Sequence, residues 1–138
     1  MFNETMLKTA GNRNSTLEIE LPNASLQPGL DSDLIYLSLK VSSGVWIGSE
    51  IEQYVHRYAL NSFLMDLLEV KSNPAHAAGL QSETDMLYLR IAGDGKTELW
   101  IYGHVEAMDH RTKLQFSFET QHQELGLNLD VIRKLGIV

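Results

Sequence analysis

Two side chains able to bind a metal or move a proton, His104 and Glu106, stand two positions apart in a run that alternates apolar and polar residues. In an extended strand this spacing puts both on the same face. Metal sites use such a pair, but a third ligand has to come from elsewhere, and His110 and His122 are the candidates. No His-Glu-x-x-His helix motif is present. We therefore expect no metal site, and a half-exposed histidine beside a glutamate is the simpler interpretation.

Other arrangements for catalysis are not found either. No Gly-x-Ser-x-Gly elbow presents a serine, and a chain without cysteine has no thiolate and no disulfide. The Ala-Gly-Asp-Gly segment at 92–95 lacks the longer glycine pattern and the following helix of a phosphate loop. No feature of the sequence singles out two acidic residues at the separation that glycoside hydrolysis needs. We expect no catalytic residue and no cofactor, which indicates a protein that is not an enzyme.

The aromatic side chains are the more suggestive feature. The runs 86–91 and 98–106 alternate apolar and mixed residues, so their aromatic rings fall opposite their leucines. Rings surrounded by acidic side chains are typical of a surface that binds another protein. We therefore predict a partner-binding face made of Tyr88, Trp100, Tyr102, His104 and Glu106.

A second interpretation of these rings stays open. The first predicted hairpin, over 34–53, carries Tyr36 and Trp46. If this hairpin packs over the rings, they form a second core and do not reach solvent. Both interpretations fit the residue pattern.

The elements that position the predicted face form an antiparallel meander. Alternating runs at 86–91, 98–106 and 114–118 are separated by turn residues. Asp94-Gly95 supplies the positive-φ positions of the first turn, and 109–113 makes the second. Each strand offers one apolar face to a core, as expected of a half-buried antiparallel sheet.

The N-terminal half predicts further strands and one amphipathic helix. Strands are expected over 16–21, 34–41 and 45–53, with Gly48 as a bulge or bend in the third. From 58 to 71 the apolar period changes to that of a helix. The apolar stripe of this helix is Leu60, Phe63, Leu64, Leu67 and Leu68.

The C-terminal segment 121–135 also keeps helical spacing. Gly126 weakens its first turn, so the helix is expected to start near Asn128, a good N-cap residue. A short strand is expected over 75–80. Residues 1–15 are either an edge strand or a flexible segment.

Together these elements predict one domain, 1–138, of the α+β class. Strands and helices are grouped along the chain and do not alternate. We expect a curved antiparallel sheet of about six to eight strands with two helices packed on it. The helix over 60–68 covers the concave, leucine-rich side.

Charge and composition narrow the possible partners. The formal net charge is −7, which disfavours nucleic acid and suits a basic partner. No apolar run approaches the ~20 residues of a membrane span, and the N-terminus lacks the apolar core of a signal peptide. We expect a cytoplasmic protein that does not bind membranes.

A sparse set of residues follows one order along the chain: Trp46, Gly48, Phe63-Leu64, Leu67-Leu68, Gly79-Leu80, Ser82-Glu83, Asp85, Leu87, Asp94-Gly95, Leu114, Phe116, Phe118-Glu119 and Leu125. This order resembles that of the WapI-type immunity proteins of bacterial polymorphic toxin systems. The resemblance covers about residues 17–135 and implies a cytoplasmic, non-enzymatic protein that binds and neutralises a cognate toxin, with no catalytic residues. The first fifteen residues and Gly126 depart from it.

We therefore predict an immunity protein that acts by stoichiometric binding to a basic toxin domain. One alternative is a small-ligand-binding or metal-dependent enzymatic domain that uses His104 and Glu106, with a deep pocket beside them. Another is a homo-oligomeric structural domain that buries the aromatic face in a homodimer.

Overall fold

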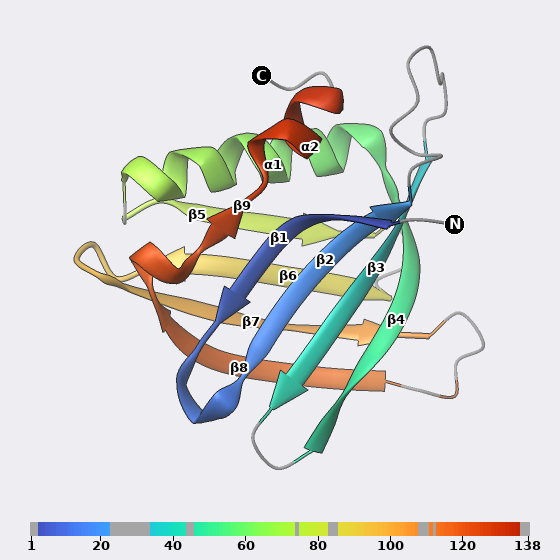
Figure 1. Ribbon diagram of the computed structural model, residues 1–138, viewed down its shortest axis with the longest axis horizontal. Coiled ribbons are helices and arrows are strands. Elements are labelled where there is room, and N and C mark those ends of the chain that lie inside the picture. Colours follow the sequence, from blue (N-terminus) through green and yellow to red (C-terminus); the bar gives the residue numbers. More distant parts are fainter. Residues whose placement is uncertain are drawn as a thin grey trace.

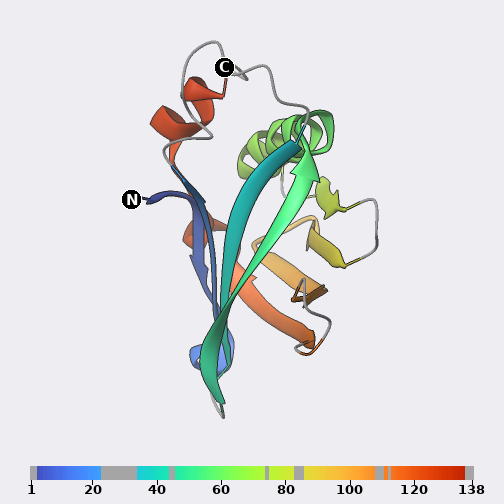
Figure 2. The same ribbon diagram turned by 90° about the vertical axis from the view of Figure 1, so that its right-hand side faces the viewer.

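The computed structural model describes residues 3–22, 34–43, 46–73, 75–82, 86–107, 111 and 113–135. Two antiparallel sheets lie face to face, and a long helix runs along the open side between them (Figures 1 and 2). Sheet A has the strand order β4 (Trp46–His56), β3 (Leu34–Ser43), β2 (Thr16–Pro22), β1 (Asn3–Ala10) and β9 (Gly126–Leu127). Sheet B has the order β5 (Ala77–Gln81), β6 (Leu87–Gly93), β7 (Glu98–Glu106) and β8 (Lys113–Gln121).

The alternation of residue types decides which face of each strand is buried. In β6, the side chains of Leu87, Leu89 and Ile91 are fully buried, and the residues between them are half-buried on the other face. In β2, Leu17 and Ile19 point into the core in the same way. Both sheets therefore turn an apolar face inward and a mixed face outward.

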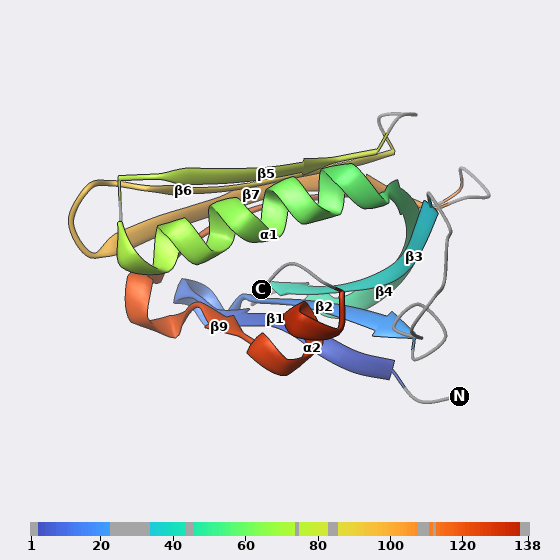
Figure 3. The same ribbon diagram turned by 90° about the horizontal axis from the view of Figure 1, so that it is seen from above.

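Helix α1 (Arg57–Ser72) seals the core between the sheets. Figure 3 shows it lying between them, along β5. Four residues of the predicted stripe are fully buried and Leu68 is half-buried, whereas Met65 on the opposite side is 62% exposed. Lys71 near its end donates a hydrogen bond to the carbonyl oxygen of Leu125 at 2.6 Å. Among the described residues, no helix is long and apolar enough to cross a membrane.

A polar contact joins the two sheets at the end of β1. The hydroxyl of Thr120 in β8 donates to the carbonyl oxygen of Ala10 at 2.6 Å, and the amide of Glu119 donates to Asn12 Oδ1 at 3.2 Å. Asn12 belongs to a 3₁₀ helix, Asn12–Asn14, that follows β1. A side chain at Gly11 would overlap the ring of Phe118, so this close approach requires glycine.

The C-terminal segment divides into three short pieces. A 3₁₀ helix at His122–Glu124 leads into β9, which pairs with β1. Helix α2 (Leu129–Lys134) begins only after Asn128, whose side chain accepts hydrogen bonds from the amides of Asp130 and Val131. The predicted start at the Asn128 N-cap is confirmed, and the residues from 121 to 127 do not form an α-helix.

The predicted α+β class with antiparallel strands and two helices is confirmed. The strands divide between two sheets because α1 carries the chain from β4 in one sheet to β5 in the other. The first strand is not an edge strand, since β1 lies between β2 and β9. The register of β3 and β4 shifts where Gly48 was predicted to mark a bulge. The predicted turn at 109–113 lies mostly outside the described residues, as do Met1 and Phe2.

We predict that Gly103→Ala destabilises the protein by about 1–3 kcal/mol. A Cβ atom at Gly103 would overlap the backbone carbonyl of Tyr88 on the neighbouring strand, so the pairing of β6 with β7 has to shift. The matched control is Gly79→Ala in the same sheet, where the nearest atom to the new Cβ lies 3.8 Å away. Urea unfolding measures both, and equal stability of the two variants would contradict the prediction.

Candidate functional site

The outer face of sheet B carries all five residues of the predicted partner-binding face. Trp100, Tyr102, His104 and Glu106 alternate along β7, and Tyr88 lies opposite His104 on β6. The inner face of the same strands packs into the core. We call the rings of Tyr88, Trp100, Tyr102 and His104 the aromatic row.

The rings of the aromatic row contact one another in sequence. The centroids of Trp100 and Tyr102 lie 5.5 Å apart with a tilt of 57°, and those of Tyr102 and Tyr88 lie 6.4 Å apart. The rings of Tyr88 and His104 stack with centroids 6.0 Å apart. These distances are within the range of favourable aromatic pairs. The row is therefore one continuous surface of rings.

Trp100 is the most exposed ring of the row. Tyr88, Tyr102 and His104 are half-buried, whereas Trp100 is 54% exposed. The indole Nε1 of Trp100 donates a hydrogen bond to Ser117 Oγ on β8 at 2.7 Å, which fixes the orientation of the ring. The indole is thus both accessible and oriented before any partner binds.

The described part of the first hairpin does not cover the aromatic row. Tyr36 contacts Tyr54 across β3 and β4, with ring centroids 4.8 Å apart, and Tyr54 is 44% exposed. Both rings lie on the outer face of sheet A, because their neighbours Ile35 and Val55 point into the core. The side chain of Trp46 lies outside the described residues.

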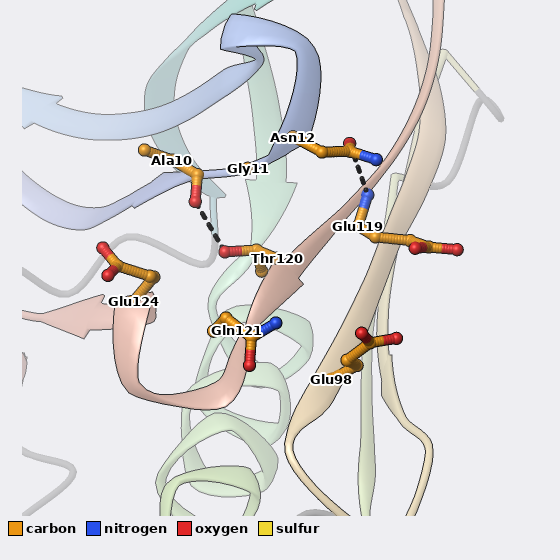
Figure 4. A pocket seen from close by; sticks show the side chains of 8 residues that line it. All are labelled: Ala10, Gly11, Asn12, Glu98, Glu119, Thr120, Gln121 and Glu124. Carbon is orange, nitrogen blue, oxygen red and sulfur yellow. Dashed lines mark hydrogen bonds between the residues drawn. The ribbon is translucent and has the colours of Figure 1, made fainter.

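Acidic side chains surround the Trp100 end of the row. Asp94, Glu98 and Glu119 line a hollow of about 200 Å³ beside the indole. A second hollow, of about 440 Å³, shares Glu98 and Glu119 and adds Glu124 (Figure 4). Farther along β7 the charges are mixed, since Glu106 lies opposite Lys113 on β8.

The outer face of sheet A is also acidic, but three of its acidic side chains, Glu18, Glu20 and Glu50, are engaged within the chain. Lys40 Nζ lies 2.8 Å from Glu20 Oε1, and this hydrogen bond raises the pKa of Lys40 above its ordinary value. Glu18 accepts a hydrogen bond from Thr5 at 3.0 Å. Glu50 accepts one from the hydroxyl of Ser38 at 2.7 Å.

The histidines proposed as metal ligands do not gather in the described structure. His104 stacks on Tyr88, whereas His122 Nε2 donates to the carbonyl oxygen of Val70 in α1 at 2.6 Å. His110 lies outside the described residues. Within the described ranges, no three histidine or acidic side chains are grouped so that they could hold a metal ion.

One further hollow, of about 450 Å³, lies at the start of α1 and was not predicted from the sequence. Its lining residues are His56, Arg57, Tyr58 and Asn61. Tyr58 is 69% exposed and stacks on His56 with ring centroids 5.3 Å apart. These residues are neighbours in the sequence, at the end of β4 and in the first turn of α1, but they match no known functional motif.

Comparisons with known proteins do not assign the chain to a family. No protein-family model, no curated protein and no solved structure matches it. The resemblance to WapI-type immunity proteins therefore stays a prediction from the sequence.

We predict that Ser117→Ala frees the Trp100 indole without unfolding the protein. Loss of the hydrogen bond to Ser117 Oγ should speed exchange of the indole N–H with water, which NMR measures directly. Gln115→Ala is the control, because Gln115 is also exposed on β8 but lies opposite His104. Equal exchange rates in the two variants would show that the hydrogen bond does not hold the ring.

Proposed function

We propose that this chain is a non-enzymatic binding protein of the cytoplasm, and that it acts as an immunity protein by binding a cognate toxin through the outer face of sheet B. The aromatic row is the observation that carries this proposal. Its rings form a connected surface on a rigid sheet, and the described part of the chain does not cover Trp100. Tryptophan and tyrosine contribute most often to binding energy at protein interfaces.

The way the rings are held favours a binding role. The cross-strand pairs and the Ser117 hydrogen bond fix the side chains before association. Little side-chain entropy is then lost when a partner docks, so more of the contact energy appears as affinity. A surface of this kind supports tight stoichiometric inhibition without any chemical step.

The charge of the chain favours a basic partner. The formal net charge is −7, and the acidic side chains near Trp100 lie at one end of the aromatic row. Opposite charges on two proteins accelerate their encounter, and the acceleration falls with added salt. A basic toxin domain would therefore associate quickly with this face.

The two alternative functions make different use of the same face. A small-ligand or metal-dependent domain requires a pocket at His104 and Glu106, and neither residue lines the hollows at Trp100, at β8 or at the start of α1. A structural homodimer would bury the aromatic row against a second copy of the chain. Light scattering of the purified protein detects that dimer.

We predict that Trp100→Ala and Tyr102→Ala each weaken toxin binding by about tenfold or more, because each removes a large ring from the aromatic row. The probe is the toxic domain of the large secreted protein that this proposal expects the neighbouring gene to encode, and calorimetry gives the affinity. Tyr58→Ala is the matched control, since Tyr58 is a 69% exposed ring at the start of α1 and does not belong to the outer face of sheet B.

Two results would contradict the proposal. The first is a neighbouring secreted protein whose toxic domain does not bind this chain. The second is binding that Tyr58→Ala weakens while Trp100→Ala and Tyr102→Ala leave it unchanged. A dimer held together by the aromatic row would assign the face to self-association.

A further inference from the structure

We infer that the Trp100 end of sheet B receives a basic segment of the partner, with an arginine side chain over the indole and a second cationic side chain in the neighbouring hollow. This inference rests on the proposed function, because it names the part of the partner that the face would recognise. The two hollows share Glu98 and Glu119, so they are adjacent seats on one surface.

The first seat is assembled around the exposed indole. Trp100 is oriented by Ser117 and stands beside Asp94 in the hollow of about 200 Å³. Asp94 is itself held in the β6–β7 turn, where its Oδ1 accepts hydrogen bonds from the amides of Lys96 at 2.7 Å and Glu98 at 3.2 Å. Gly95 permits this turn with a φ of 83°. An aromatic face and one fixed carboxylate, that of Asp94, are therefore offered together.

The second seat lies between the end of β8 and the turn after β1. Figure 4 shows Glu98 and Glu124 on either side of Gln121, with Ala10 and Asn12 above them in this view. The hydrogen bond from Thr120 to Ala10 holds the two walls of this hollow together. The second seat is therefore formed by contacts between residues of the two sheets.

The charges of both seats favour a cationic occupant. Asp94, Glu98, Glu119 and Glu124 line them, and neither hollow has a lysine, arginine or histidine among its described lining residues. The carboxylates of Glu98, Glu119 and Glu124 accept no hydrogen bond and form no ion pair within the described structure. Glu18, Glu20 and Glu50 on sheet A differ, because each has an internal partner.

The spread of the carboxylates favours a chain segment over a single ion. No three of them are grouped so as to hold one metal ion within the described ranges. Arginine suits the first seat because its planar guanidinium stacks on an indole and also pairs with carboxylates. Lysine is a point charge and gains less from the ring.

In the test, the acetylated and amidated tripeptide Arg-Gly-Arg is added to the full chain, and ¹H–¹⁵N NMR of the chain measures its binding. We expect saturable shifts of the Trp100 indole N–H and of the amides of Asp94, Glu98 and Glu119, weakened by salt. The isosteric but neutral citrulline peptide should bind at least about tenfold more weakly, because it lacks the charge that cation–π contacts and ion pairs need. The Lys-Gly-Lys peptide should bind less well than the arginine peptide.

Two double variants complete the test. Glu98→Gln with Glu119→Gln should abolish the shifts, because it removes the carboxylates that both seats share. Glu52→Gln with Glu69→Gln is the control, since both residues are exposed acids on β4 and α1. Equal binding of the citrulline peptide, or shifts on the outer face of sheet A in place of sheet B, would overturn the inference.

The outcomes separate this inference from the proposed function. If Trp100→Ala weakens toxin binding while Glu98→Gln with Glu119→Gln does not, the aromatic face binds the toxin and the inference of two cationic seats is wrong. If the arginine peptide binds as expected but the toxic domain does not, the seats are correct and the immunity proposal is wrong.

Discussion

The constraint on which the whole structure depends is the joint burial of three leucine-rich surfaces: the inner faces of the two sheets and the apolar stripe of α1. Burying each large apolar side chain contributes about 1.5–3 kcal/mol before the entropy cost of folding. Successive residues in a strand point to opposite faces, so burying Leu87, Leu89, Leu99 and Ile101 places Tyr88 and Trp100 outside. The aromatic row is therefore exposed as a direct consequence of how the core is packed. A slip of one residue in either strand would exchange the two faces.

Much of this arrangement could be predicted from the sequence because it depends on local periodicity. Alternation in 86–91 and 98–106 is enough to put Tyr88, Trp100, Tyr102, His104 and Glu106 on one face, and the structure places them there. The helical stripe from Leu60 to Leu67 is equally local. At the C-terminus, the helical spacing of 121–135 was misleading before Asn128. Leu125 is buried there from a non-helical segment, and Gly126 approaches the carbonyl of Lys8 on β1.

What the sequence did not predict depends on contacts between distant residues. The strands divide into two sheets because α1 carries the chain from one sheet to the other. The apolar periodicity of the sequence does not indicate this change of sheet. The seat beside Trp100 needs the register of β7 and β8, which sets Trp100 opposite Glu119. The second seat needs Thr120 to meet Ala10, across 110 residues of chain. Acidic residues that look alike in the sequence also differ in their surroundings. Glu20 is bonded to Lys40, whereas Glu98 lines both seats.

The central claim is that this molecule works through the outer face of sheet B. Oxidative footprinting of the chain, alone and in complex with the toxic domain that the proposed function expects the neighbouring gene to encode, tests that claim most directly. The account predicts that modification of Trp100 and Tyr102 falls sharply in the complex, while Tyr54 on sheet A and Tyr58 on α1 react as before. Protection of Tyr54 with Trp100 still reactive would place the interface on sheet A and contradict the account.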